Sequence, residues 1–409
     1  MNYNETLEYI HSLGNFSLAP GLERIKKVLS ILGDPQKNLK SIHIAGTNGK
    51  GSVSAMLSSI FMTAGYKTGL FISPFIIDFR ERIQINGIYI SKKDLIRYAE
   101  MVKSTGIKLT EFEFITAEAF LYFKEQNIDI LICETGLGGR LDATNALDNL
   151  IAAVITKISL DHTEILGDTI EKITYEKCGI LRDCPTVSSP FQDESALKVI
   201  KSAAKNLIIP ETDALEIIKR DITGSTFIYM CKEYEISLCG EYQIENAVTV
   251  IETVSASGYD IPYNLIYEGL KNTHFPARME VVSKSPIIIL DGAHNPDGAD
   301  VLSKELKEYS GKVTAVIGMM RDKDYREVLR KTLCHCKAAL AVTVPGLSRS
   351  LSAEELCRTA NEFCKCDVAN SLSKSLKKAI QISEGEPIFI FGSLYLASAI
   401  RPILKEMFK

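Results

Sequence analysis

The sequence has no long hydrophobic run and no excess of basic residues, and each absence excludes a broad class of protein. Its longest late apolar stretch, which starts at Ile388, is interrupted by Gly392 and Ser393 and is too short for a transmembrane helix. Lysine and arginine together number 47 against 51 aspartates and glutamates, and the net charge is −4. An extended nucleic-acid surface needs a basic excess, so we expect neither a membrane nor a nucleic acid as partner.

We expect neither a secretory leader nor a disulfide framework. The first residues contain glutamates and no apolar core, so we expect a cytoplasmic location and reduced thiols for the 10 cysteines. The pairs Cys334/Cys336 and Cys364/Cys366, with His335 beside them, leave a zinc site as an alternative. Their C-x-C spacing is unusual for structural zinc, and small buried hydrophobic side chains are the favoured interpretation.

Short apolar runs alternate with helical patterns along most of the chain, which predicts parallel sheets covered by helices. Strands of a first sheet are predicted at residues 41–46, 67–73, 128–134 and 151–159, and a hairpin at 224–238. A second series of five strands is predicted at 287–295, 312–320, 338–344, 365–369 and 387–393. Polar residues at 282–285 and Pro286 interrupt the pattern between the two series. The sequence therefore predicts an α/β protein with domains at 1–282 and 283–409.

A glycine loop with the sequence GTNGKGS lies between a predicted strand and a predicted helix, at residues 46–52. A phosphate site needs backbone N–H groups at a helix N-terminus, glycines that permit the turn, and a lysine. The loop departs from the standard P-loop pattern, because Ile44 replaces its first glycine and Gly51 replaces the hydroxyl residue that reaches Mg²⁺. We predict a phosphate site whose metal needs another hydroxyl. A glycine-rich turn without a ligand is the alternative.

Glu134 ends a predicted strand and is followed at once by a second glycine-rich loop, TGLGGRLD. A carboxylate that emerges from an apolar strand into such a loop is well placed to hold a hard cation. The alternative is an acid satisfied by the amides of its own loop.

The sequence GTNGKGS resembles the phosphate loop of folylpolyglutamate synthases and dihydrofolate synthases, which belong to the Mur-type ATP-dependent amide ligases. The resemblance recurs along nearly the whole chain, in SPFIIDFRERIQING, ETGLGGRLDATN, LDHTEILGDTIEKITYEKCGI, FPARMEVV, LDGAHNPDGA and FGSLYLA. It implies a P-loop first domain of the Mur ligase central type and a smaller Rossmann-like second domain. It also implies ATP-dependent addition of L-glutamate to folate, with dihydropteroate as a second acceptor to consider.

The resemblance further implies the residues that hold ATP and metal. The ATP-binding residues are Thr47, Asn48, Gly49, Lys50, Gly51, Ser52, Asn246, Arg278, Asp291 and His294. The Mg²⁺ ligands are Ser73, Glu134, His162 and Lys177, the last in carbamylated form, and the catalytic residues are Lys50, His162 and Lys177. Taken alone, these residue types would favour a turn serine, a structural histidine and an exposed helical lysine.

A folate acceptor has a flat ring system and anionic groups, so its pocket needs aromatic surface and polar partners. The resemblance places this pocket at Phe75, Arg82, Phe112, Leu141, Asp142 and Ala143, together with residues 17–25. Phe75 and Phe79 would stack on the ring, and Arg82 would meet a carboxylate. Core packing is the alternative for the phenylalanines.

A carboxylate is a poor electrophile, so amide formation requires its activation. The implied mechanism transfers the γ-phosphoryl group of ATP to the acceptor carboxylate, and the amine of glutamate then attacks the acyl phosphate. Other readings are a P-loop nucleotide switch, a small-molecule kinase and another Mur-type amino-acid ligase. ATP turnover that requires both folate and glutamate would favour the folate ligase. We expect a monomer.

Overall fold

The computed structural model describes residues 1–14 and 21–408. Residues 15–20 overlap the predicted acceptor segment 17–25, and that part of the prediction lies outside the described residues. The chain divides into two compact units. The first unit contains Met1–Ile218, Thr226–Ile236 and Gln243–Thr273, and the second contains Lys219–Ser225, Ser237–Tyr242 and His274–Lys409.

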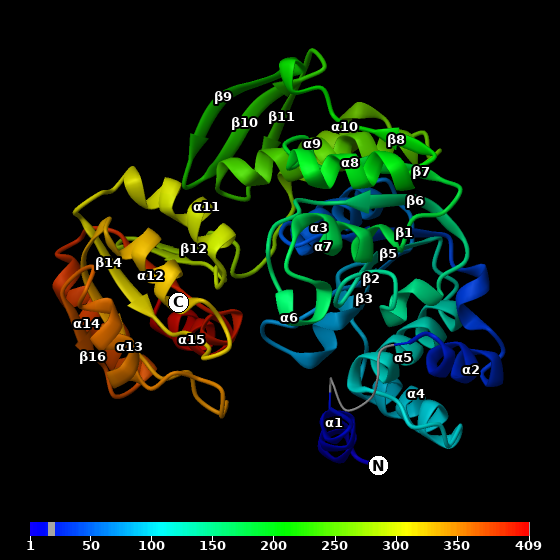
Figure 1. Cartoon of the computed structure of the whole chain (residues 1–409), viewed down its shortest axis with the longest axis horizontal. Helices are drawn as coiled ribbons and strands as arrows, with labels where there is room; N and C mark the ends of the chain where they lie inside the picture. The colour runs from blue at the N-terminus through cyan, green and yellow to red at the C-terminus, as the bar shows by residue number, and fades with distance from the viewer. Residues whose placement is uncertain (15–20, 409) are drawn as a thin grey trace. The chain divides into compact units, whose positions relative to one another are not determined.

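An eight-stranded sheet with the order β4-β3-β2-β5-β1-β6-β7-β8 forms the centre of the first unit (Figure 1). Its strands are β1 (Ser41–Ala45), β2 (Thr68–Phe71), β3 (Ile83–Ile85), β4 (Ile88–Tyr89), β5 (Ile130–Glu134), β6 (Leu150–Ile155), β7 (Pro185–Ser188) and β8 (Asn206–Ile208). β2, β5, β1, β6, β7 and β8 run parallel to one another. β3 and β4 add an antiparallel edge beside β2. The predicted strands are confirmed, although β6 ends before the predicted residue 159. The shorter β3, β4, β7 and β8 were not predicted.

The helices of the first unit cover both faces of this sheet or pack on the helices that do. They are α1 (Tyr3–Ser12), α2 (Glu23–Ile31), α3 (Lys50–Thr63), α4 (Lys92–Ser104), α5 (Glu111–Glu125), α6 (Thr163–Leu166), α7 (Ile170–Cys178), α8 (Glu194–Ala203), α9 (Glu241–Ala256) and α10 (Tyr263–Lys271). Cys133 of β5 and Ala45 of β1 lie on the same face of the sheet. On this face α5 packs on β5, whereas α7 and α8 pack on β1 and β6. α3 packs on the opposite face. Crossovers between parallel strands are right-handed, so connections that run in opposite directions along the sheet lie on opposite faces, as those from β1 to β2 and from β2 to β5 do.

A separate three-stranded sheet has the order β11-β10-β9. Its strands are β9 (Leu215–Asp221), β10 (Gly224–Tyr229) and β11 (Lys232–Ile236). The predicted hairpin at 224–238 is confirmed by β10 and β11, whereas β9 was not predicted.

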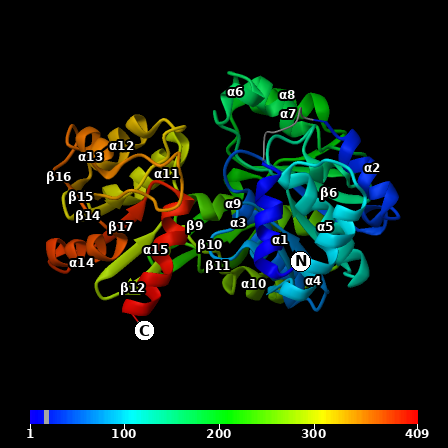
Figure 2. The ribbon, with the colours of Figure 1, turned by 90° about the horizontal axis from the view of Figure 1, so that it is seen from below.

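The second unit contains a six-stranded sheet with the order β12-β13-β17-β14-β15-β16. Its strands are β12 (Glu280–Lys284), β13 (Ile287–Leu290), β14 (Val313–Ile317), β15 (Cys336–Ala341), β16 (Cys366–Val368) and β17 (Ile388–Phe391). The helices are α11 (Pro296–Lys307), α12 (Tyr325–Leu333), α13 (Ala353–Ala360), α14 (Leu372–Ser383) and α15 (Leu394–Met407). Figure 2 shows α11, α12 and α13 on one face of this sheet and α14 and α15 on the other.

The five predicted strands of the second series are present, but β12 is a sixth strand that the sequence analysis missed. It pairs antiparallel with β13 along the edge of the sheet. Polar residues at 282–285 and Pro286 resemble a linker, yet an edge strand tolerates both because one side of it faces solvent. The predicted domain division between residues 282 and 283 therefore falls inside a strand.

Among the helices that the structure describes, none has both the length and the apolar character that crossing a membrane requires.

Candidate active site

The glycine loop connects β1 to α3 in the middle of the first sheet. Gly46 and Gly49 have φ angles of 156° and 91°. A Cβ atom on Gly46 would lie 1.8 Å from Oγ1 of Thr156, which follows β6. Only glycine permits this approach, so the loop is held close to the neighbouring strand.

The backbone amides of the loop divide into two groups. The N–H groups of Thr47 and Asn48 donate to the carbonyl of Lys157 at 2.9 and 3.2 Å, so they tie the loop to the segment after β6. α3 begins at Lys50 without a side-chain cap. The amides of its first turn have no partner within the helix, and the helix dipole favours an anion there. The first turn of α3 therefore presents amides suited to a phosphate, and the ATP-binding role of Thr47 and Asn48 stays a prediction.

Two lysines converge on one carbonyl of the loop. Lys50 Nζ donates to the carbonyls of Gly46 at 3.0 Å and Thr47 at 3.2 Å. Lys177 Nζ, from α7, donates to the same Gly46 carbonyl at 2.7 Å. The residue is only 4% exposed, in contrast to the exposed lysine expected from its residue type. Burial and then the charge of Lys50 lower the pKa of Lys177 to about 7, so a large share of it is the uncharged amine near neutral pH.

The second glycine loop docks α7 in this position. A Cβ atom on Gly139 would lie 2.6 Å from the carbonyl of Lys177. The N–H of Arg140 donates to the carbonyl of Glu176 at 2.7 Å, and the Arg140 guanidinium pairs with the Glu176 carboxylate at 2.8 Å. Gly139 of ETGLGGRLD therefore permits the close approach of α7 to this loop.

Ser73 and Glu134 are brought together at the carboxyl ends of the adjacent strands β2 and β5. The Glu134 carboxylate is buried and accepts the N–H of Ser73 at 3.3 Å. A hydroxyl and a carboxylate at one sheet edge are the hard oxygen donors that Mg²⁺ prefers, so this pair fits the predicted metal.

His162 occupies a different local setting. It precedes α6 with a φ of 51°, its side chain is 44% exposed, and Nε2 lies 4.0 Å from Oδ2 of Asp161. Within residues 1–14 and 21–408, no three His, Cys, Asp or Glu side chains gather into a group that could hold a metal. The zinc alternative is therefore not assembled among these residues, and the metal role of His162 beside Glu134 stays a prediction.

The predicted acceptor residues lie mainly around the start of α5. The guanidinium of Arg82 lies 5.3 Å from the ring centre of Phe75 and 5.6 Å from that of Phe79. It also lies 4.0 Å from the carboxylate of Glu111. Phe112 packs against Phe71, with ring centres 5.9 Å apart. The two rings also pack against each other, with centres 5.7 Å apart, so the chain places a largely buried cation beside a pair of aromatic rings.

The segment from Leu141 to Ala143 is split between surface and interior. The buried carboxylate of Asp142 accepts N–H groups from Leu137 at 2.8 Å and Thr144 at 3.0 Å. Ala143 belongs to the core, whereas Leu141 is exposed. Asp142 therefore shapes the glycine loop, and Leu141 is the member of the three that offers surface to a ligand.

Asn246 lies against the phosphate loop, as its predicted role requires. A Cβ atom on Gly49 would lie 2.5 Å from Asn246 Oδ1. Its amide Nδ2 donates to Oε1 of Gln243 at 3.0 Å, which turns Oδ1 toward the loop. Gln243 was missed by the sequence analysis, although its spacing of three residues from Asn246 on a helix is a usable signal.

The remaining predicted ATP residues belong to the second unit. Asp291 follows β13 and accepts the N–H groups of Met279 at 2.9 Å and Ala293 at 2.8 Å. Burial raises the pKa of Asp291, and the nearby charge of Arg278 opposes that rise. The Nδ1 of His294 donates to the carbonyl of Gly292 at 2.8 Å.

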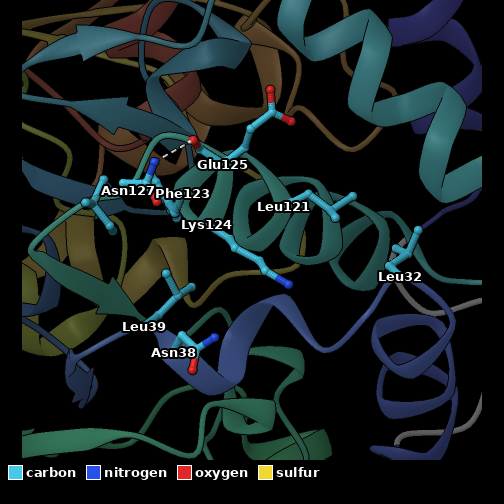
Figure 3. Close-up of a pocket in the computed structure, with 9 residues that line it drawn as sticks. Leu32, Asn38, Leu39, Leu121, Phe123, Lys124, Glu125 and Asn127 are labelled. Atoms are coloured by element: carbon cyan, nitrogen blue, oxygen red, sulfur yellow. Dashed lines mark hydrogen bonds between the residues drawn. The ribbon is translucent and has the colours of Figure 1, made fainter.

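A cavity of about 530 Å³ lies elsewhere in the first unit, between the end of α2 and the C-terminal half of α5. Figure 3 shows the side chains of Leu39, Leu121 and Lys124 around it. None of the predicted ATP, metal or acceptor residues lines this cavity, so it is separate from the candidate active site.

The model of the Mur ligase middle domain matches residues 44–254, and that of the Mur ligase glutamate ligase domain matches residues 277–394. The chain is 33% identical to the folylpolyglutamate synthase of Lacticaseibacillus casei, over 99% of each protein. It is 35% identical to the dihydrofolate synthase/folylpolyglutamate synthase of Bacillus subtilis, over 98% of this chain and 99% of that protein.

A solved structure of E. coli FolC in complex with DHPP and ADP shares the fold. Its TM-score is 0.90 at 30% identity, and the match covers 100% of this chain and 98% of the other. The motifs, the two units and these matches agree along the whole length. The chain belongs to the folylpolyglutamate synthase and dihydrofolate synthase family of Mur-type ligases.

Proposed function

We propose that this chain is an ATP-dependent ligase that adds L-glutamate to folates and also accepts dihydropteroate. The observation that carries the proposal is the convergence of Lys50 and Lys177 on Gly46, at the uncapped start of α3. The Lys50 amine and the helix N-terminus form a site for a highly charged phosphate group, and Lys177 lies beside them. The relatives named for both activities, and the E. coli protein that holds DHPP and ADP, supply the substrate class.

The phosphates of ATP bind at the first turn of α3, at Lys50, Gly51 and Ser52. Lys50 leaves the loop carbonyls and offsets the charge of the transferring γ-phosphoryl group. Asn246, which already lies against Gly49, contacts the nucleotide from α9. Thr47 and Asn48 act by holding the loop on the segment after β6.

Ser73 and Glu134 would hold Mg²⁺, and His162 and Lys177 are the further ligands that we propose. When bound, the ion supplies positive charge that offsets the phosphates of ATP. The contact between Ser73 and Glu134 supports the first two assignments.

We infer that Lys177 is carbamylated. Its amine is buried beside Lys50, and both effects favour the neutral form that reacts with CO₂. A bond forms between Nζ and the carbon of CO₂ while the amine loses a proton. The product is a carbamate anion. This change replaces a repulsion between two amines with an attraction between Lys50 and an anion.

The acceptor binds near Phe75, Arg82, Phe112 and Leu141, with its aromatic part on the rings beside Arg82. Its carboxylate oxygen attacks the γ-phosphorus and forms an acyl phosphate, and ADP leaves. The amine of glutamate then attacks the acyl carbon, and inorganic phosphate leaves as the amide forms. We propose Arg278, Asp291 and His294 as further ATP-binding residues.

The function is tested by incubating the protein with ATP, Mg²⁺ and L-glutamate, and with either dihydropteroate or a reduced folate. We expect each acceptor to gain the mass of one glutamyl group, because each carries a carboxylate that can be activated: on the aminobenzoate ring in dihydropteroate and on the glutamate tail in the folate. Mass spectrometry of the products provides the measurement, and the Lys50→Ala protein is the inactive control. ATP hydrolysis without a heavier product from either acceptor would contradict the proposal and favour a nucleotide switch. The monomeric state and the cytoplasmic location stay predictions.

A further inference from the structure

Arg278 lies between two residues whose backbone conformation is unfavourable. Ala277 has a φ of 55° and Met279 a φ of 49°, and neither is a glycine. A residue with a Cβ atom is strained in this left-handed region, and such strain persists only where the surroundings hold the backbone. The turn that carries Arg278 therefore needs support from outside itself.

Arg278 Nη1 itself donates to the Ala277 carbonyl at 3.3 Å, and three further hydrogen bonds, with Asp291, Gly292 and Glu280, hold the backbone of this turn. The N–H of Met279 donates to the Asp291 carboxylate at 2.9 Å, and the N–H of Gly292 donates to the Ala277 carbonyl at 2.9 Å. The third is donated by the N–H of Ala277 to Oε2 of Glu280 at 3.0 Å. Asp291 already has a proposed role in ATP binding. Glu280 has none, so its carboxylate is a new element of the arrangement.

The Glu280 carboxylate is fixed by an arginine that is far away in sequence. Arg401 of α15 donates from Nε to both carboxylate oxygens at 2.9 Å and from Nη2 to Oε1 at 2.7 Å. The side chains of Arg401 and Glu280 are only 11% and 20% exposed. A forked, poorly hydrated pair fixes a carboxylate in position and orientation, unlike a flexible surface pair.

We propose that Glu280 and Arg401 are positioning residues that hold the strained turn of Arg278 in its ligand-binding conformation. The inference rests on the proposed role of Arg278 in ATP binding. Arg401 fixes the Glu280 carboxylate, which accepts the N–H of Ala277 and so holds the backbone that carries Arg278. Loss of either member lets Ala277 relax toward an ordinary conformation and displaces the guanidinium.

The test compares Arg401→Gln, Arg401→Lys and Glu280→Ala with the unmodified chain. Arg326→Gln is the matched control, because it breaks a forked pair with Glu362 on the exposed surface of the same unit. We expect Arg401→Gln and Glu280→Ala to raise the KM for ATP on the order of tenfold, because a displaced binding group loses much of its effect. The KM for the folate acceptor should not change, and kcat at saturating ATP should fall far less. Arg401→Lys keeps the charge but not the fork, so an intermediate KM is expected.

Hydrogen exchange of the free protein gives a readout that does not depend on activity. The amide of Ala277 should exchange faster in Arg401→Gln and Glu280→Ala, and at the normal rate in Arg326→Gln. An unchanged KM for ATP with unchanged exchange in the folded Arg401→Lys and Arg401→Gln proteins would overturn the inference. Arg278→Ala separates the two levels. If Arg278→Ala raises the KM for ATP but the Arg401 variants leave it unchanged, only the positioning role is wrong. If Arg278→Ala itself leaves the KM for ATP unchanged, the proposed role of Arg278 in ATP binding is wrong.

Discussion

Replacing Lys177 with alanine is expected to lower kcat by roughly 10³-fold, which is the upper range for loss of one charge-stabilising group at a reacting centre. The reason is its position. Lys177 is buried and reaches the Gly46 carbonyl of the phosphate loop at 2.7 Å, and Lys50 donates to the same carbonyl, so the carbamate that we propose would lie close to Lys50. Initial rates of glutamate addition at saturating substrates provide the measurement.

A matched control lies on the same helix. Lys172 is 62% exposed and pairs with Asp168 at 2.8 Å, so Lys172→Ala should keep normal activity. Acetate should partly restore Lys177→Ala, because a small carboxylate in the vacated space replaces the oxygens of the carbamate. It should not restore Lys50→Ala. Normal activity in Lys177→Ala would contradict the site, and an inactive variant without rescue would contradict the carbamate.

Replacing Glu118 with glutamine is expected to stabilise the first unit at alkaline pH by about 1–3 kcal/mol, the usual penalty of an unsatisfied buried polar group. Glu118 lies fully buried in α5, and neither carboxylate oxygen has a hydrogen-bond partner among the described residues. Burial raises the pKa of Glu118 well above its ordinary value of 4.5. The folded chain therefore binds a proton that the unfolded chain releases as the pH rises.

The sign of the pH dependence follows from that difference. The contribution of Glu118 to stability is most favourable below pH 4.5 and falls as the pH rises toward the folded pKa. Glu118→Gln cannot ionise, so its advantage should be absent at acidic pH and grow toward alkaline pH. Scanning calorimetry of the first unit across this range measures it. Glu125→Gln, at an exposed position of the same helix, is the control, and equal pH profiles for Glu118→Gln and the unmodified chain would refute the assignment.

Much of the fold was predictable because apolar runs mark strands that are buried on both faces. β1, β5 and β14 are buried at every residue, and each was predicted. β12 was missed because its residues are only partly buried and Pro286 follows it. β9 was missed for the same reason, since most of it is exposed. Edge strands satisfy their backbone through one neighbour, so their side chains carry little of the pattern that reveals a strand.

The candidate site was predictable where a residue's position after a strand determines its surroundings. Ser73 and Glu134 were predicted from their positions at the ends of strands, and they meet because β2 and β5 are adjacent in the sheet. The burial of Lys177 could not be predicted from a helical pattern, since it depends on the packing of Gly139 against α7. The support of Arg278 by Arg401 joins residues far apart in sequence, and no local pattern encodes such a pair.

We propose that ATP activates the acceptor by transferring its γ-phosphoryl group to the acceptor carboxylate. This transfer is tested with an acceptor in which a heavy isotope replaces both carboxylate oxygens, and the released inorganic phosphate is analysed by mass spectrometry. We expect one labelled oxygen in each phosphate released with product, because the bond between the acyl carbon and that oxygen breaks when glutamate attacks. Glutamate addition with unlabelled phosphate would contradict it.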